Sequence, residues 1–233
     1  MPDTDTGALR QLHDDPATRK RFLTMVGGTA ATGALALLAA ACGGSDSKGA
    51  ATTGAATTTK ASASSDIAIV NYALTLEYVE ADFYRQAVDS GRIKDRATAD
   101  LAKHIAETEQ AHVDALHGTV MKLGGTPAAK PATKFDAVLA AGPAKILQTA
   151  ATVENLGAAA YLGQAGRIKS KEILAAALSI HSVEARHAAA LNELVGRGFK
   201  GGSSLEGSIP DGAFAKALTI DQVLARVRPF LAS

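Results

Sequence analysis

The sequence has a single cysteine, no tryptophan and few aromatic residues. The one cysteine, Cys42, excludes a disulfide within the chain, and it excludes any zinc or iron–sulfur site that needs several cysteines from one chain. Metal chemistry in this protein must therefore use oxygen and nitrogen ligands. Apolar residues make up 47% of the chain and are rich in alanine and leucine, which favour helix over sheet.

The chain also lacks an excess of either charge, with 24 Lys and Arg against 23 Asp and Glu. This balance gives no electrostatic reason to expect nucleic acid as a partner. A length of 233 residues allows one domain of ordinary size with its own core, together with extensions.

The first 41 residues have the pattern of an export signal. A basic stretch at residues 18–21 precedes an uncharged, mildly apolar run at residues 22–41 that ends in small residues. The motif Thr-Arg-Lys-Arg-Phe-Leu-Thr resembles a bacterial twin-arginine signal, with Lys20 in place of one arginine of the pair. This difference leaves the choice between the twin-arginine and general export routes open.

Residues 38–43, Leu-Ala-Ala-Ala-Cys-Gly, resemble the processing box of a bacterial lipoprotein. We expect cleavage before Cys42 and a lipid on its thiol. A retained transmembrane anchor is the alternative, since 20 residues can span a bilayer, although Gly, Ala and Thr insert weakly. Both readings place the rest of the protein at the extracytoplasmic face of the bacterial membrane. Residues 42–65 are small or polar, which predicts a flexible linker.

Helical periodicity begins at Asp66 and predicts a four-helix bundle over residues 66–198, so the expected fold class is all-α. The first predicted helix ends near Gly91, and the second covers about residues 97–123. The third begins near Pro143, and the fourth covers about residues 170–195. Each apolar stripe is interrupted at its middle by carboxylates or imidazoles. In the C-terminal segment, residues 199–233, a capping-box pattern at Thr219 predicts a short helix that packs on the bundle.

Two Glu-x-x-His motifs occur, at residues 109–112 and 184–187. Residues three apart on an α-helix lie on one face, so each motif places a carboxylate beside an imidazole. The tetrapeptide Gly-Arg-Ile-Lys also occurs twice, at residues 91–94 and 166–169. The same offset of 75 residues relates both repeats, which indicates an internal duplication.

A second pair of residues repeats at an offset of 77, since Glu77 with Tyr84 recurs as Glu154 with Tyr161. A short turn makes the two helices of each half antiparallel, so the lone Glu and the Glu-x-x-His motif reach similar heights. A connection of about 19 residues between the halves is long enough to cross the bundle. Two such hairpins bring six side chains to one layer: Glu77, Glu109, His112, Glu154, Glu184 and His187.

This pattern resembles the ferritin-like superfamily of di-iron and di-manganese carboxylate proteins. The segments that carry the resemblance are LTLEYVEADFY, ETEQAHVDAL, ATVENLGAAAY and SVEARHAAAL. They look most like bacterial secreted ferritin-like domain proteins, which include desiccation-related proteins. The six-residue set is also similar to that of bacterioferritin, rubrerythrin and manganese catalase. The resemblance implies two antiparallel hairpins joined by a long crossover.

The resemblance further implies roles for the six residues. Glu77 and Glu154 would each be a terminal ligand of one metal ion, and Glu109 and Glu184 would bridge the two ions. His112 and His187 would each complete the coordination of one ion. Independently of the resemblance, two divalent cations would balance four carboxylates that lose hydration in an apolar layer. Oxygen and imidazole ligands suit iron and manganese alike.

Other polar residues on the stripes have weaker claims. Glu80 lies one turn from Glu77 and competes with it as a ligand, but we expect Glu80 to lie in the second shell or in solvent, because its counterpart in the repeat is Gly157. We expect Tyr84 and Tyr161 to pack in the bundle and bond a carboxylate, or to support the metals directly. Surface or second-shell positions are expected for the unrepeated histidines His104, His117 and His181, and solvated positions for Glu107, Glu172 and Glu193.

The resemblance implies oxidoreductase chemistry of a ferroxidase or peroxidase type, with O2 or H2O2 as the small-molecule partner. Whether the site turns over stays open at this point. One alternative is a binding module that captures metal without turnover, and another is a metal-free structural bundle that protects under stress. A homo-oligomer is compatible with the sequence, which carries no signal for or against it.

Overall fold

A computed structural model describes residues 53–197 and 214–232, and the side chains of residues 64–197 and 214–232. The chain divides into two units, Met1–Thr58 and Thr59–Ser233, and all contacts described below lie within the second. The predicted export signal and Cys42 lie outside the described residues. Among the helices that are described, none is long and apolar enough to cross a membrane.

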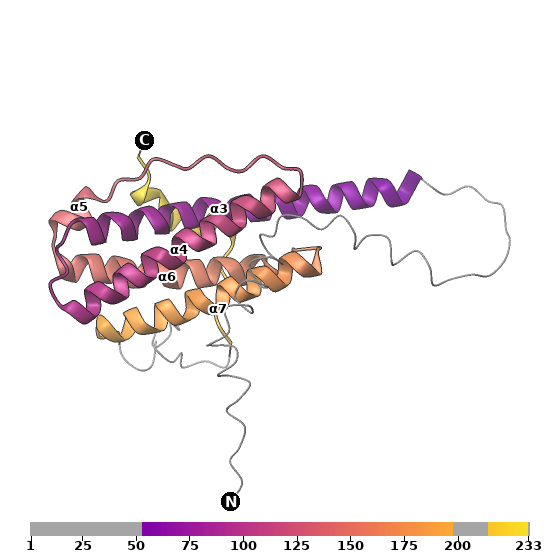
Figure 1. The fold of residues 1–233 in the computed structure, drawn as a ribbon. Helices are drawn as coiled ribbons and strands as arrows, with labels where there is room; N and C mark the ends of the chain where they lie inside the picture. Colours follow the sequence, from indigo (N-terminus) through magenta and orange to yellow (C-terminus); the bar gives the residue numbers. More distant parts are fainter. Residues whose placement is uncertain (1–52, 198–213, 233) are drawn as a thin grey trace, which may run out of the picture. The chain divides into compact units, whose positions relative to one another are not determined.

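The bundle is formed by four long helices, α3 (Thr53–Asp89), α4 (Arg96–Lys122), α6 (Pro143–Ala165) and α7 (Lys171–Leu194). They form two hairpins, α3 with α4 and α6 with α7, that lie alongside each other (Figure 1). No strand is assigned within the described residues, so the predicted all-α fold is confirmed.

Local chemistry explains where these helices begin and end. Asp95 and Ser170 are the N-caps of α4 and α7, and their side-chain oxygens accept hydrogen bonds from the backbone N–H three residues ahead. Gly91 after α3 and Gly124 after α4 have φ values of 57° and 76°, a left-handed conformation that glycine adopts without a Cβ penalty. Pro143 occupies the first turn of α6, where its missing N–H costs nothing.

Helix α3 begins at Thr53, well before the predicted start at Asp66. This corrects the sequence prediction for residues 53–65, which belong to a helix instead of a flexible linker. After Gly54 the stretch has neither proline nor glycine and contains several alanines. Extending an existing helix costs much less free energy than nucleating one, so such residues can continue α3 backwards.

The connection between the hairpins crosses the length of the bundle, as the sequence predicts, and contains the one-turn helix α5 (Asp136–Ala140) (Figure 1). Two buried or half-buried residues of α3 hold it in place. The Asn71 side chain pairs with the backbone of Thr126 and Ala128 at 3.0 and 2.7 Å. Asp82 accepts hydrogen bonds from Lys130, at 3.1 Å, and from the Thr133 hydroxyl.

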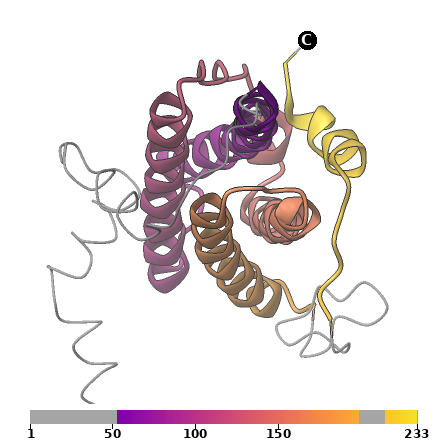
Figure 2. The same ribbon diagram turned by 90° about the vertical axis from the view of Figure 1, so that its right-hand side faces the viewer.

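Residues 214–232 pack on the α3 and α6 side of the bundle (Figure 2). Helix α8 (Ile220–Val227) begins with the predicted capping box at Thr219, buries two valines and continues into the 3-10 turn η2 (Arg228–Phe230). Leu231 then pairs with Thr133 of the connection in an isolated bridge. At Gly163 an added Cβ would overlap the Leu218 carbonyl, so the tail approaches α6 more closely than any side chain would allow.

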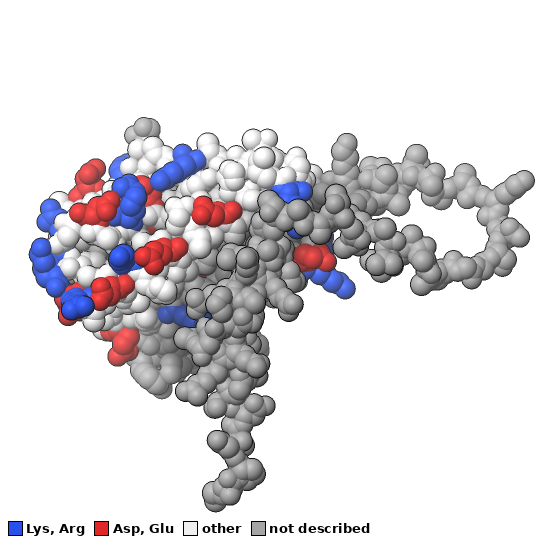
Figure 3. Space-filling view, in the orientation of Figure 1, with Lys and Arg blue, Asp and Glu red and all other residues white. Residues whose placement is uncertain are grey.

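Two apolar clusters fill the bundle on either side of a polar layer. One contains Phe83, Ile105, Ile146 and Leu191, and the other contains Leu74, with residues from all four long helices contributing across the two. Along α4 and α7 the Glu-x-x-His residues lie between these clusters. The exterior carries charges of both signs, interspersed over the face shown in Figure 3.

A buried carboxylate joins α3 to the start of α7, and its removal tests this part of the fold. Asp66 is 2% exposed and accepts hydrogen bonds from the backbone N–H groups of Lys169 and Ser170 at 2.9 and 2.8 Å. We expect Asp66→Ala to lower the free energy of unfolding by about 1–3 kcal/mol, because it leaves two backbone donors without an acceptor. Urea denaturation measures this change. Asp100→Ala is the control, since Asp100 is largely exposed, and a loss of equal size there would contradict the account.

Candidate metal centre

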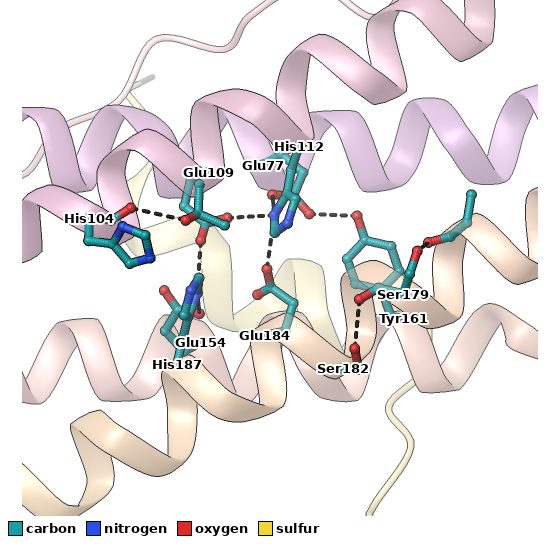
Figure 4. Close-up of polar contacts among 12 residues, drawn as sticks. Glu77, His104, Glu109, His112, Glu154, Tyr161, Ser179, Ser182, Glu184 and His187 are labelled. Carbon is teal, nitrogen blue, oxygen red and sulfur yellow. Dashed lines mark hydrogen bonds and ion pairs between the residues drawn. The ribbon is translucent and has the colours of Figure 1, made fainter. Parts of the chain in front are cut away.

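The six residues singled out by the duplication lie together in the middle of the bundle (Figure 4). The four glutamates are fully buried, and the two histidines are 8% and 9% exposed. Their ligand atoms form two groups in which all atoms lie within 4.8 Å of one another. Both groups contain Glu109 and Glu184. The remaining members are Glu77 and His112 in one group, and Glu154 and His187 in the other.

In the first group, the Nδ1 atom of His112 faces three carboxylates from three different helices. It lies 3.1 Å from Glu109 Oε2, 3.3 Å from Glu77 Oε2 and 3.3 Å from Glu184 Oε1. Because these residues belong to α3, α4 and α7, the group exists only when the two hairpins are packed together.

The second group is built in the same way around His187. Its Nδ1 atom lies 3.0 Å from Glu109 Oε1 and 3.2 Å from Glu154 Oε2. Glu109 therefore directs one oxygen to each histidine and lies between them (Figure 4). A carboxylate in this position can serve two cations at once.

The two tyrosines contact the glutamates of the opposite half. The Tyr161 hydroxyl on α6 donates a hydrogen bond of 2.5 Å to Glu77 Oε1 on α3. Tyr84 on α3 is buried beside Glu154 on α6, and the pKa of its hydroxyl is raised by burial and by that carboxylate. The Tyr84 hydroxyl itself has no hydrogen-bond partner among the described residues. Of the two tyrosines, Tyr161 forms the expected hydrogen bond to a carboxylate and Tyr84 does not.

Glu80 is not in solvent, which corrects one of the two positions that the sequence analysis expected for it. Its side chain is 4% exposed and lies close to Glu184, although it belongs to neither four-residue group. Its place on the inward stripe, one turn after Glu77, was the signal in the sequence for burial.

Burial dominates the electrostatics of most of these carboxylates. It raises the pKa of Glu77 to about 7, against the opposing effect of His112. The pKa values of Glu80 and Glu184 are raised further, first by burial and then by repulsion from the other carboxylates. Desolvation and like charge both favour the protonated form, so the metal-free site retains protons at neutral pH.

Glu109 is the exception because it is next to both imidazoles. Burial alone would raise its pKa, but contacts with His112 and His187 outweigh this and hold it at about 2. For His187, burial would lower the pKa, whereas Glu109 and Glu154 raise it to about 9. The pKa of His112 is raised as well, by its three glutamates. The ionised Glu109 between two protonated imidazoles is thus the electrostatic centre of the metal-free site.

The residues present suit a pair of divalent cations. Three buried glutamate oxygens have no hydrogen-bond partner among the described residues and are not the oxygens that face an imidazole: Glu80 Oε2, Glu154 Oε1 and Glu184 Oε2. Buried polar atoms without partners are rare in native proteins and call for an explanation such as an ion. Carboxylate and imidazole donors are those that iron and manganese accept.

The polar residues without a repeat counterpart lie outside the centre. His104 and His117 are exposed, as are Glu107, Glu172 and Glu193. His181 is half-buried, with its Nδ1 atom 3.0 Å from the Ala158 carbonyl oxygen. The expectation of surface positions for His104, His117 and the three glutamates is therefore confirmed.

Comparison with known proteins agrees with this fold. A protein-family model described as a ferritin-like domain matches residues 65–197, which is more than half of the chain and includes all of α4, α6 and α7 and most of α3. No curated protein matches the sequence.

Protons and metal compete for this centre, so metal affinity should depend on pH. A divalent ion must displace the proton from His187, whose pKa is about 9, and from the fraction of Glu77 that is protonated near its pKa of about 7. We expect Mn²⁺ affinity to rise between about pH 6 and pH 8, with release of at least one proton per chain. Calorimetry in buffers of different ionisation enthalpy measures both quantities. Affinity that does not change over this range would contradict the electrostatic description.

Proposed function

This chain belongs to the ferritin-like domain family, and we propose that it holds two divalent iron or manganese ions for chemistry with dioxygen or hydrogen peroxide. One observation carries the proposal. Two buried groups of four ligand residues share the same two carboxylates, Glu109 and Glu184, and each adds its own glutamate and histidine. A single ion would leave one of these groups without a cation.

Each residue has a role that follows from its position. Glu77 and His112 would hold one ion, Glu154 and His187 the other, and Glu109 and Glu184 would lie between the two ions. These six residues contribute four negative charges when the histidines are neutral, and two divalent ions balance them. Without that balance, carboxylates in an apolar layer lose hydration and repel each other.

The bound ions would supply electron exchange with the oxidant, and the chain supplies the surroundings. Its apolar clusters exclude bulk water from the layer, which limits entry to small molecules such as O2 and H2O2. Tyr161 fixes the orientation of Glu77 through its hydrogen bond.

The direct test is metal content followed by oxidant turnover. We expect the natively purified chain, loaded anaerobically with Fe²⁺, to bind two ions and to oxidise them on exposure to O2 or H2O2. In Glu109→Gln the shared ligand is lost, so we expect loss of at least one ion and a decrease in oxidation rate of about tenfold or more. Glu107→Gln is the matched control, because Glu107 lies two residues away on α4 and is exposed.

The outcomes separate the candidate functions. Two ions with oxidant-dependent turnover support the proposal, whereas tight binding of two ions without turnover supports metal capture instead. If the chain binds no ion at any metal concentration, the result supports the alternative of a metal-free structural bundle. Equal effects of Glu107→Gln and Glu109→Gln would contradict the assignment of Glu109.

We also propose that the protein is exported and tethered to the membrane by a lipid on Cys42, on the strength of its N-terminal sequence pattern. Cys42→Ser removes the thiol that would carry the lipid. We expect the unmodified chain to fractionate with membranes and the variant to appear in the soluble extracytoplasmic fraction, with mass spectrometry showing the lipid. If the variant stays with the membrane, the uncharged run at residues 22–41 is retained as an anchor.

A further inference from the structure

A fifth carboxylate, Glu80, is buried next to the proposed metal pair without a partner of its own. Its side chain is 4% exposed, and its Oε2 atom has no hydrogen-bond partner among the described residues. The small cavity beside Glu80 is otherwise lined by glycine and by apolar side chains of α3, α6, α8 and η2: Leu76, Val79, Val153, Leu156, Gly157, Val227 and Phe230. None of these side chains can donate a hydrogen bond to the carboxylate.

The space for Glu80 is provided by Gly157 on the facing helix α6. A Cβ at this position would lie 2.9 Å from Glu80 Oε1 and 2.5 Å from Glu184 Oε2, and both distances are too short for any side chain to be accommodated without movement. Gly157 is in α6, where its φ is not positive, so backbone conformation does not require glycine here. The requirement comes from the two carboxylates that occupy the space.

The duplication explains why the two residues face each other. The offset of 77 that carries Glu77 onto Glu154 also carries Glu80 onto Gly157. Equivalent positions of α3 and α6 meet next to the shared Glu184, which leaves room for one carboxylate and not for two. The first half of the duplication therefore supplies the Glu80 carboxylate, and Gly157 in the second half leaves the space that it occupies.

We propose that Glu80 is an additional ligand of the metal pair and that it makes the two metal positions unequal. Glu184 directs Oε1 toward His112 and Oε2 toward the space that Glu80 shares. A cation bound by Glu184 is the partner that the buried Glu80 carboxylate otherwise lacks. Because the position equivalent to Glu80 in the second half is Gly157, this extra carboxylate occurs once in a site whose other six ligands come in matching pairs. This inference rests on the proposed function.

The experiment compares metal binding by the full chain and by Glu80→Gln, using Fe²⁺ and Mn²⁺ under anaerobic conditions. Glutamine keeps the size of the side chain and removes its charge, so we expect the metal-free variant to melt at or above the temperature of the unmodified chain. We expect one of the two ions to bind at least about tenfold more weakly and the other to keep its affinity. The electron paramagnetic resonance spectrum of the Mn²⁺ pair should change as well.

A second variant tests the space itself. Gly157→Ala places a methyl group against both carboxylates, so we expect weaker metal binding and an altered Mn²⁺ spectrum. Gly118→Ala is the matched control, because Gly118 is also within a long helix and an added Cβ there would meet nothing within 4 Å. It should bind metal as the unmodified chain does.

The outcomes of this experiment and of the one on proposed function are distinct. If the unmodified chain binds two ions but Glu80→Gln binds both with unchanged affinity and spectrum, Glu80 is not a ligand, and the proposed function stands. If the unmodified chain binds neither Fe²⁺ nor Mn²⁺, the proposed function fails, and this inference fails with it.

Discussion

The structure depends on one unfavourable arrangement, the burial of five carboxylates in the apolar interior of a helical bundle. Desolvation and mutual repulsion both oppose it, and two imidazoles offset only part of the negative charge. The metal-free site meets this with protons, as the raised pKa values of Glu77 and His187 show. Bound cations would neutralise the same carboxylates without protonation. Protons and metal ions therefore compete for this site.

The rest of the fold holds this layer in register. The side chains come from rigid helices, which position a site more accurately than loops do, and an apolar cluster on each side fixes the helices against one another. The connection is fastened to α3 through Asn71 and Asp82, and the start of α7 through Asp66. The tail covers the groove between α3 and α6 next to Glu80. The contacts of Asn71, Asp82 and Asp66 lie outside the two ligand groups and hold the helices and the connection in place.

Much of this could be predicted from the sequence because a duplication repeats information. The offset of 75 residues paired the two Glu-x-x-His motifs, and the helical period placed Glu77 and Glu154 at their height, where the structure has them. The early start of α3 and the tail pairing at Thr133 were missed, and the position of Glu80 was left open between the second shell and solvent. Helix extension through small residues leaves no periodic apolar signal, and long-range pairing depends on tertiary packing. The space for the Glu80 side chain exists because Gly157 has no side chain, and this can be recognised only once α3 and α6 are known to face each other.

The central claim is that this layer binds two cations between Glu109 and Glu184. Anomalous X-ray diffraction from crystals of the Mn²⁺-loaded chain tests it most directly. We expect two adjacent anomalous peaks inside the bundle, one contacting Glu77 and His112 and the other contacting Glu154 and His187. Peaks only at surface carboxylates, or none, from crystals that contain the folded bundle would contradict it.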